Sequence, residues 1–477
     1  MITEPWNKER LEALFGRCQD VQSHRLPGEE GVLLYCEGLA GFERIAENLS
    51  AGLEERIRED RRGLPLPVER LSPGITGDAL ADRIFSGKAL LYFDASGALY
   101  SVDCADRPER TPQESTTEPT NYGPKDGFIE QLTVNVALIR KRLKTEKLAC
   151  EQLTIGTRSK NRVALLYMED LLEESTLLQV RERLHSIDTE ALMTNEELKA
   201  LLQRPGFSFL PMMYITTRPD MAVESLMNGR FVLLMDGIPN VLIAPVNLSF
   251  LMTGAEDAHM PPAFNYVSIL MRRFGFVVTL LLPGFWTALT TYHQDQIPFS
   301  LLATISVQNM GTPISGPLEL MLMMFMFHLF FEAGIRLPST LGPSISVVGG
   351  LIIGDAIIDA GLSSPASLVV AAVTSISQFV LSGGLFGVGM GLIRIYIFLL
   401  SAVFGLFGFF TGAFSVLVYL ANLRSFGVPF LTPFSPPVWK DLRFVFTRMP
   451  RGEERRRPEA LKYKVPSKRD GVGEGQG

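Results

Sequence analysis

Two carboxylates stand four residues apart in a part of the chain that is otherwise almost without charge. Asp355 and Asp359 belong to the segment 341–360, and positions three or four apart share one face of a helix. The same face carries three further residues: Ser344, Val348 and Leu351. If this helix were repeated around an axis, the aspartates would form rings of negative charge, which favour cations. Val348 and Leu351 would then form an apolar constriction, so the segment predicts a pore lining.

The same segment has a second interpretation, and the sequence favours neither strongly. Both aspartates could lie at the membrane interface and cap the helix end near Gly361. Gly350 and Gly354 form a small-xxx-small pair, which predicts close helix packing on another face. Outside this segment, Glu332 and Arg336 are spaced i and i+4 and could pair with each other.

Two more charged residues of the apolar region have structural interpretations. Glu319 lies near the start of a predicted helix, where a carboxylate suits the helix dipole. Arg394 is a single cation near a helix start, where its side chain can reach the headgroups.

The sequence contains no motif of enzyme chemistry. It lacks a dinucleotide fingerprint, a GxSxG elbow and an HExxH pair. Four acids follow predicted strands, where we expect them to cap helices or hold turns: Glu37, Glu169, Asp94 and Asp236. The four cysteines are widely spaced and predict free buried thiols: Cys18, Cys36, Cys104 and Cys150. We therefore expect no catalytic residue, no metal and no cofactor, and the chain is not predicted to be an enzyme.

Charge is distributed very unevenly along the 477-residue chain. Residues 1–260 hold 29 basic and 40 acidic residues, residues 261–439 hold five of each sign, and residues 440–477 hold eleven basic and six acidic. A stretch as long as 261–439 with so few charges cannot form a soluble domain, because soluble surfaces need far more polar coverage. A purely cytosolic enzyme, a secreted disulfide scaffold and a disordered chain are thereby excluded.

The polar half contains an internal repeat. The buried-strand pattern Leu33-Leu-Tyr-Cys-Glu37 matches Leu165-Leu-Tyr-Met-Glu169. About fifty residues later, a helix ended by glycine leads into a predicted β-hairpin in both copies, with first strands at 89–93 and 231–235 and turns at Gly97 and Gly237. We predict helices over 42–58, 133–147 and 174–186. The repeat indicates two tandem, related α/β subdomains.

The apolar half predicts a helical transmembrane domain with four to six spans. Five segments are long enough to cross about 30 Å of hydrocarbon: 274–292, 318–333, 341–360, 366–387 and 392–423. The last is longer than needed, which predicts that it tilts or projects. Residues 298–310 are short and partly polar, typical of an interfacial or re-entrant segment.

Basic residues predict the orientation. Arg272 and Arg273 precede the first span, and the tail is basic, so both flanks are expected in the cytosol. This requires an even number of crossings, which is six if 298–310 also crosses or four if one glycine-rich segment is re-entrant. No leader-like segment is seen in residues 1–20, which predicts that the polar half stays cytosolic.

These patterns divide the chain into four predicted parts. Residues 1–127 form the first cytosolic α/β subdomain with a Pro-rich linker, and residues 128–260 form the second. Residues 261–439 form the helical transmembrane domain, and residues 440–477 form a basic cytosolic tail. We expect the tail to lie beside anionic lipid and its end to be disordered.

The order of features resembles the A subunit of the GerA family of spore germination receptors. The similar stretches of the polar half are Lys160-Asn-Arg-Val-Ala-Leu-Leu-Tyr-Met-Glu169, Arg218-Pro-Asp220 and Met235-Asp-Gly237 with Ala244-Pro245. Those of the apolar half are Phe331-Glu-Ala-Gly-Ile-Arg-Leu-Pro338, Val347-Val-Gly-Gly350, Ala360-Gly-Leu-Ser-Ser-Pro365 and Pro429-Phe-Leu-Thr-Pro433. The likeness covers about residues 30–450.

The resemblance implies a non-enzymatic protein of the spore inner membrane. It implies a homo-oligomer that forms a gated cation pathway, together with a transporter-like B subunit that senses nutrient and a lipoprotein C subunit. No nucleic acid is expected as a partner. The alternatives are a secondary transporter, although no inverted repeat is visible, and a membrane-anchored scaffold or enzyme.

Overall fold

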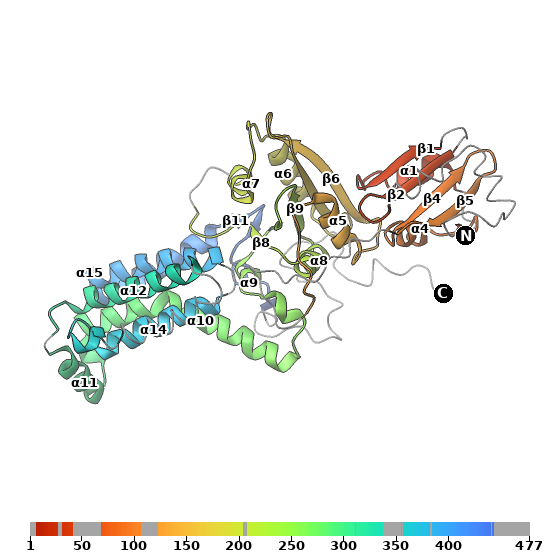
Figure 1. The fold of residues 1–477 in the computed structure, drawn as a ribbon. Coiled ribbons are helices and arrows are strands. Elements are labelled where there is room, and N and C mark those ends of the chain that lie inside the picture. Colours follow the sequence, from red (N-terminus) through yellow and green to blue (C-terminus); the bar gives the residue numbers. More distant parts are fainter. Residues whose placement is uncertain are drawn as a thin grey trace.

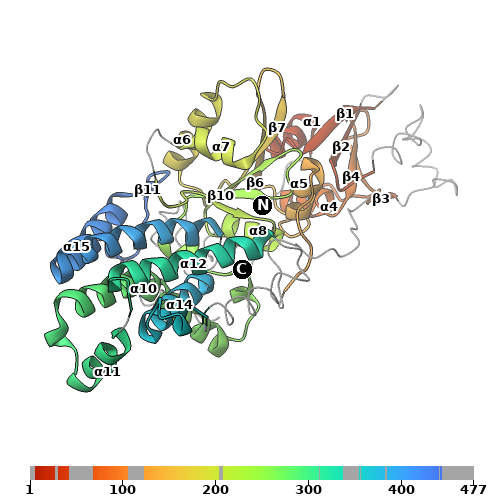
Figure 2. The same cartoon turned by 60° about the vertical axis from the view of Figure 1, so that its left-hand side comes forward.

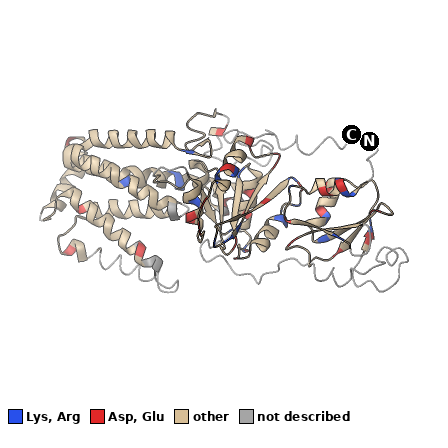
Figure 3. Ribbon diagram, turned by 90° about the horizontal axis from the view of Figure 1, so that it is seen from above, with Lys and Arg blue, Asp and Glu red and all other residues tan. Residues whose placement is uncertain are grey.

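The chain folds into two β-sheet units and one helical bundle, which follow one another along an elongated molecule (Figure 1). The computed structural model describes residues 6–26, 31–41, 68–105, 123–203, 208–310, 312–336, 354, 356–381, 384–439 and 441–442. Charged side chains gather on the two sheet units, while the described part of the bundle is nearly free of them (Figure 3). The division of charge in the sequence thus corresponds to a division in space.

The first unit is built on a five-stranded antiparallel sheet in the order β1-β2-β4-β5-β3. Its strands are β1 (Val21–Arg25), β2 (Gly31–Cys36), β3 (Val68–Arg70), β4 (Lys88–Phe93) and β5 (Ala98–Asp103). The helices α1 (Lys8–Leu14) and α4 (Gly77–Ile84) bury their apolar residues against the sheet. All side chains of β2 are buried, because both faces of this central strand are covered.

The second unit repeats this plan with the strand order β6-β7-β9-β10-β8. Its strands are β6 (Leu148–Ile155), β7 (Asn161–Met168), β8 (Tyr214–Thr216), β9 (Phe231–Met235) and β10 (Val241–Ala244). Its helices are α5 (Leu132–Arg140), α6 (Glu174–His185), α7 (Asn195–Leu202) and α8 (Pro219–Met227). Separate apolar clusters fill the two faces of this sheet.

The two sheets have the same topology, as the sequence repeat indicates. Each predicted hairpin is present, as β4 with β5 and as β9 with β10. The glycines before them, Gly87 and Gly229, have positive φ angles of 90° and 67°, which suit a residue without a Cβ. The helix expected over 133–147 ends earlier, at Arg140, because the chain must turn there to enter β6. The predicted helix 42–58 lies outside the described residues.

The bundle contains α10 (Pro262–Tyr292), α11 (Phe299–Asn309), α12 (Gly316–Arg336), α14 (Pro365–Val380) and α15 (Gly384–Asn422). The short α9 (Leu248–Leu251) and a 3-10 turn (Ala255–Ala258) precede it. α10 packs mainly on α15 and α14 (Figure 2). α11 lies at the end of the bundle that is far from the sheets (Figure 1).

α15 is a hairpin of two antiparallel arms and not one long helix. Gly405 reverses the chain with φ 62° and ψ −140°, a conformation that residues with a Cβ rarely adopt. The arms touch closely: a Cβ at Gly408 would collide with the Leu400 carbonyl oxygen, and Tyr396 Oη lies 3.0 Å from Ser415 Oγ. The expectation of one tilted segment over 392–423 is therefore wrong, because a glycine in this conformation turns the chain back.

A second break corrects the expected span 366–387. α14 ends at Val380, and α15 begins at Gly384, so the glycine-rich stretch joins two helices. In the described residues, two helical segments are long and apolar enough to cross a membrane, the helix Pro262–Tyr292 and the hairpin Phe386–Asn422. Two shorter helices are also apolar, Gly316–Phe330 and Pro365–Val380.

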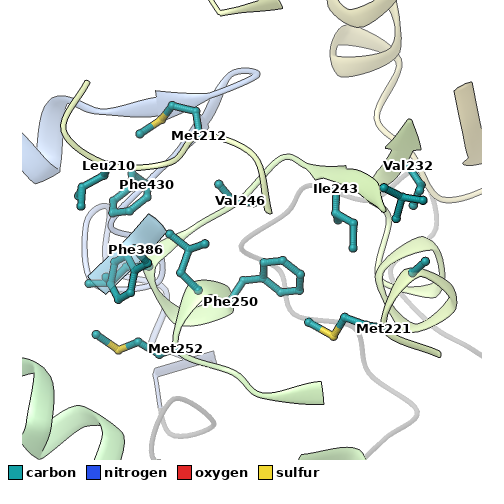
Figure 4. Close-up of a cluster of buried hydrophobic side chains, with 14 of the residues drawn as sticks. Leu210, Met212, Met221, Val232, Ile243, Val246, Phe250, Met252, Phe386 and Phe430 are labelled. Atoms are coloured by element: carbon teal, nitrogen blue, oxygen red, sulfur yellow. The ribbon is translucent and has the colours of Figure 1, made fainter. Parts of the chain in front are cut away.

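The second sheet unit and the bundle share one apolar core (Figure 4). Phe386 lies at the start of α15, and Phe430 follows the end of α15. Both lie near Val246 and Phe250 of the sheet unit. Ser425 Oγ donates to the Met212 carbonyl (2.7 Å) and accepts from the Val246 amide (3.1 Å).

The chain after α15 therefore inserts into the second sheet unit. It forms the short strands β11 (Arg424–Ser425) and β12 (Val428–Pro429). The Phe426 ring lies edge-on to Phe231 with centroids 5.0 Å apart, and the Leu248 amide donates to the Phe430 carbonyl at 2.7 Å. We call residues 424–430 the C-terminal plug.

Candidate functional site in the helical bundle

Most of the predicted pore residues lie outside the described residues. This applies to Ser344, Val348, Leu351 and Asp355, and to the packing residue Gly350. Gly354 is described, and a Cβ at this position would lie 3.7 Å from Leu368 Cδ2 of α14. Gly354 thus faces a neighbouring helix, while the role of the segment as a pore lining stays a prediction.

Asp359 lies in the last turn of its helix, and it is exposed. The Gly361 amide donates to the Ile358 carbonyl, and the Leu362 amide donates to the Ile357 carbonyl, with Gly361 at φ 67°. This pair of bonds is a Schellman motif, which ends a helix. The carboxylate therefore stands at the end of the helix that points away from the sheets.

The predicted pair of Glu332 and Arg336 lies near the end of α12. Glu332 is half-buried, and the side chain of Arg336 lies outside what the structure describes. The spacing of the two residues places them on consecutive turns of one helix, as the sequence predicts.

The best-defined polar group of the bundle is the carboxylate of Glu319 on α12, which is 1% exposed. Its Oε1 accepts hydrogen bonds from Ser363 Oγ (2.9 Å), from Ser364 Oγ (2.8 Å) and from the Ser364 amide. Ser364 is also the N-cap of α14 and accepts from the Ser367 amide. One carboxylate oxygen thus binds the residue at which another helix begins.

This arrangement explains how a charge can be buried among apolar helices. The free amides at a helix N-terminus carry partial positive charge and favour an anion. In the described part of the chain no Lys or Arg forms an ion pair with Glu319, so the start of α14 supplies the compensation. The sequence predicted a dipole interaction with the helix of Glu319 itself, whereas the carboxylate binds a different helix.

Arg394 on the first arm of α15 forms the second buried polar group, with 5% of its surface exposed. Its Nη1 donates to Gln378 Oε1 at 3.0 Å, and Gln378 Nε2 donates to the Gly387 carbonyl at 3.0 Å. The expectation that this side chain reaches the headgroups is wrong, because Gln378 of α14 holds the guanidinium between helices. Within the described ranges its Nε atom has no hydrogen-bond partner.

The two groups fix opposite ends of α14. Glu319 holds its first residues, and Arg394 binds Gln378 two residues before its end. Sequence analysis missed Gln378, because an amide in an apolar helix carries no spacing signal. The Ser-Ser-Pro sequence before α14 does predict an N-cap, but no pattern indicates that its partner is Glu319.

Two of the acids that follow strands, Asp236 and Glu169, have structural partners. Asp236 Oδ1 accepts from the Leu132 amide at 3.0 Å, and its Oδ2 pairs with Arg162 at 3.1 Å. Glu169 forms an ion pair with Arg17. Asp236 thus binds the start of α5, which lies about a hundred residues earlier in the chain, whereas the sequence predicts a cap on the next helix or a turn.

The cysteines are free and buried, as predicted. Cys18, Cys36 and Cys150 surround the buried ion pair between Arg140 and Asp20, in which Nε and Oδ2 are 2.7 Å apart. Burial raises the pKa of all three thiols, so they stay protonated and unreactive. Among the residues described, no group of three or more His, Cys, Asp or Glu is placed to hold a metal ion.

Comparison with known proteins gives matches along nearly the whole chain. A family model described as Bacillus/Clostridium GerA spore germination protein matches residues 9–460. Spore germination protein XA of Bacillus anthracis is 40% identical over 391 residues, which are 81% of this chain and 78% of that protein. Spore germination protein KA of Bacillus subtilis (strain 168) is 31% identical over 451 residues, 93% and 82% of the two chains.

A solved structure also matches the polar half. It is the N-terminal domain of the A subunit of the Bacillus megaterium spore germinant receptor GerK3. The likeness has a TM-score of 0.37 and 24% identity, and it covers 51% of this chain and 95% of that one.

Proposed function

The chain belongs to the GerA family of spore germination proteins, and from this premise we propose that it is the membrane subunit of a nutrient-responsive germination receptor. The observation that carries the proposal is the family match over residues 9–460, which spans both sheet units and the bundle. Under this proposal, residues 1–127 and 128–260 form two cytosolic subdomains, and residues 440–477 form a cytosolic tail. The sheet units then act as binding or regulatory modules and not as enzymes.

The arrangement of the bundle supports a multi-pass protein with an even number of crossings. α10 leads away from the sheets, and α12 and α14 both start at the far end, where Glu319 meets Ser364. Each arm of α15 adds one crossing, because the chain reverses at Gly405. If the predicted span 341–360 is a further crossing, the count is six, which leaves both flanks on one side, as the basic residues require.

The finer part of the proposal is a gated cation pathway in an oligomer of this chain. Its lining is the face of Ser344, Val348, Leu351, Asp355 and Asp359, while Gly350 and Gly354 pack against neighbouring helices. The fixed position of α14, which is held at both ends by Glu319 and Arg394, supports this proposal because it gives the lining helix a rigid neighbour. The transporter-like B subunit and the lipoprotein C subunit are the proposed partners in the spore inner membrane.

Thiol block tests the pathway. Spores that carry Val348→Cys, Leu351→Cys or Asp355→Cys should lose nutrient-triggered release of monovalent cations after treatment with a membrane-permeant thiol reagent. The matched control is Val369→Cys, at an outward position of α14 that is 60% exposed, where release should be unchanged. Insensitivity at all three lining positions would refute the pore assignment. Deletion of this chain from spores that have no other germination receptor tests the receptor role. Normal germination of these spores would refute it.

A further inference from the structure

The guanidinium of Arg394 is a buried charge in the bundle that has no counter-charge among the described residues. Its Nη1 donates to Gln378 Oε1, a neutral amide oxygen, at 3.0 Å. The Nε atom has no hydrogen-bond partner in the described ranges, and no Asp or Glu described there forms an ion pair with the side chain. A charge so deeply buried among apolar helices requires an anionic partner. Arg394 therefore lacks the partner that its burial requires.

The described acids of the bundle do not supply this partner. Residues 261–439 contain five acids: Asp295, Glu319, Glu332, Asp355 and Asp359. Glu319 binds the opposite end of α14, and Asp295 and Asp359 are exposed. Glu332 lies on α12 and forms no ion pair with Arg394. Asp355 lies outside the described residues, so an anion from solution is the remaining source besides that carboxylate.

A second polar group without a partner lies at the same level of the bundle. Thr279 of α10 is 0% exposed, and its Oγ1 has no hydrogen-bond partner in the part of the chain that the structure describes. α10 and the first arm of α15 run side by side in the same direction, since the end of α10 meets the turn at Gly405. A Cβ at Gly284 of α10 would lie 3.1 Å from Ile397 Cγ2 of α15. Counted back from this contact, Thr279 is five positions away and Arg394 is three, so their levels along the helices differ by only about 3 Å.

Thr279 also faces α14, the helix that carries Gln378. It follows Gly275 by four positions and therefore lies on the same face of α10. A Cβ at Gly275 would lie 3.1 Å from the carbonyl oxygen of Ser377, the residue before Gln378. Thr279, Gln378 and Arg394 thus lie at one level on three adjacent helices, α10, α14 and α15.

The hydrogen-bond donors at this level suit an anion. Nε and Nη2 of Arg394 lie on one edge of the planar guanidinium, and such an edge binds anions through two parallel hydrogen bonds. A Cβ at Gly391 would lie 3.9 Å from Nη2, so no side chain at this position covers that edge. The Thr279 hydroxyl adds a third donor. The positive charge of Arg394 repels a cation, so these donors select a negative ion.

We propose that Arg394 and Thr279 bind a small monovalent anion between α10, α14 and α15, and that Gln378 positions the guanidinium. The anion accepts hydrogen bonds from the Nε and Nη2 edge and from the Thr279 hydroxyl, and it neutralises the buried charge. Because Arg394 is only 5% exposed, the site suits an ion of the size of chloride and excludes a lipid headgroup. None of its residues belongs to the predicted pore lining, so the inference goes beyond the proposed cation pathway.

Equilibrium dialysis of the full chain in mild detergent tests this site, with radioactive chloride as the probe and gluconate to hold the ionic strength constant. The chain should bind chloride at a single saturable site. Thr279→Val keeps the shape of the side chain but removes the hydroxyl, and it should weaken binding about tenfold because a hydrogen bond to a charged acceptor is lost. The matched control is Thr287→Val. It removes another buried hydroxyl without a described partner, about two turns further along α10, and should leave binding unchanged.

Two further variants separate the anion from a carboxylate of the chain itself. Arg394→Gln should abolish chloride binding, with circular dichroism as the check that the variant is folded. Absence of saturable binding by the wild type, undiminished binding by Arg394→Gln, or equal weakening in the two threonine variants would overturn the proposal. Chloride binding that arises only in Asp355→Asn would also overturn it, because that carboxylate would then be the partner of Arg394. Binding is measured on the purified chain without germination, so a negative result concerns the anion site and leaves the receptor role untouched.

Discussion

At the scale of single residues, the buried charge of Arg140 is satisfied by a partner that lies far away in sequence. Arg140 is fully buried, binds Asp20 of the other sheet unit with two nitrogens, and lies over the Phe85 ring at 4.1 Å. The Cys150 carbonyl also accepts from the Gln19 amide, so backbone bonds join the two units at the same place. The ion pair therefore fixes the position of one sheet unit on the other.

Arg140→Ala should destabilise the contact between the two units. Removal of one partner leaves the Asp20 carboxylate buried and unpaired, which costs about 3–5 kcal/mol. Urea titration that follows Trp6 of the first unit measures the change. The control is Arg158→Ala, because the pair of Arg158 and Glu190 is more than 70% exposed and contributes only about 0–1 kcal/mol. An equal effect of both substitutions would contradict the assignment.

Asp220 should make the second sheet unit less stable in acid. Burial alone would raise the pKa of its carboxyl, but the hydrogen bonds and charge of Arg218, with a bond from His259, hold the pKa below the usual 3.8. The carboxylate then stabilises the folded state above pH 3.8 and loses this effect as the pH falls through the lowered value. The difference in free energy of unfolding between the wild type and Asp220→Asn should be largest near neutral pH and should shrink below pH 3.8. A pH-independent difference between pH 3 and pH 7 would refute this role.

At the scale of elements, α14 is the fixed part of the bundle. It is bound at its start by Glu319 of α12 and near its end by Arg394 of α15, so three helices are joined through polar groups that lipid cannot supply. Side chains in the core of a membrane lack water as an alternative partner, and such bonds therefore specify which helices are neighbours.

Glu319→Ala should destabilise the bundle more than the substitution of either serine that binds its carboxylate. It removes three hydrogen bonds to a buried carboxylate, and a loss of about 3 kcal/mol is expected. Ser363→Ala removes one donor and should cost about 1 kcal/mol. Thermal unfolding of the detergent-solubilised chain gives both values. If the two variants unfold at the same temperature, the carboxylate does not hold α14.

The sequence predicts the elements well where one local pattern decides them. The buried strands β2 and β7 are short continuous apolar runs, both hairpins follow a helix that ends in glycine, and both copies of the repeat agree. The hairpin within α15 was missed, because the residues around Gly405 are as apolar as a continuous span and only the backbone conformation marks the turn. The partners of Glu319 and Arg394 were missed for a related reason. Contacts between helices distant in sequence follow from packing, which leaves no spacing pattern.

At the scale of the whole molecule, the second sheet unit and the bundle behave as one body. Their apolar residues form a common core (Figure 4). Ser425, which follows α15, bonds to Met212 and Val246 of the sheet unit. A movement of the sheet unit therefore displaces the end of α15 directly. This connection offers a path between the sheet units and the proposed cation pathway.

Ser425→Ala should weaken this connection without unfolding either part. Ser425 is 1% exposed, and the loss of its hydroxyl leaves the Met212 carbonyl and the Val246 amide without these bonds, at a cost of about 1–3 kcal/mol. Hydrogen exchange should accelerate in residues 208–213 and 245–252 and stay unchanged in the first sheet unit. Ser415→Ala, within the bundle, is the control. Faster exchange throughout the chain would instead indicate global unfolding.

The C-terminal plug also dictates an order of events during synthesis. Phe426 packs against Phe231 in the core of the second sheet unit, but it is synthesised 195 residues after Phe231. At about 5–20 residues per second, this interval lasts roughly 10–40 s, and all bundle helices are made within it. The position of the C-terminal plug in the second sheet unit therefore stays unfilled until the second arm of α15 has been inserted into the membrane. A chain that stops before residue 424 lacks Phe426 and therefore leaves the apolar core around Phe231 incomplete.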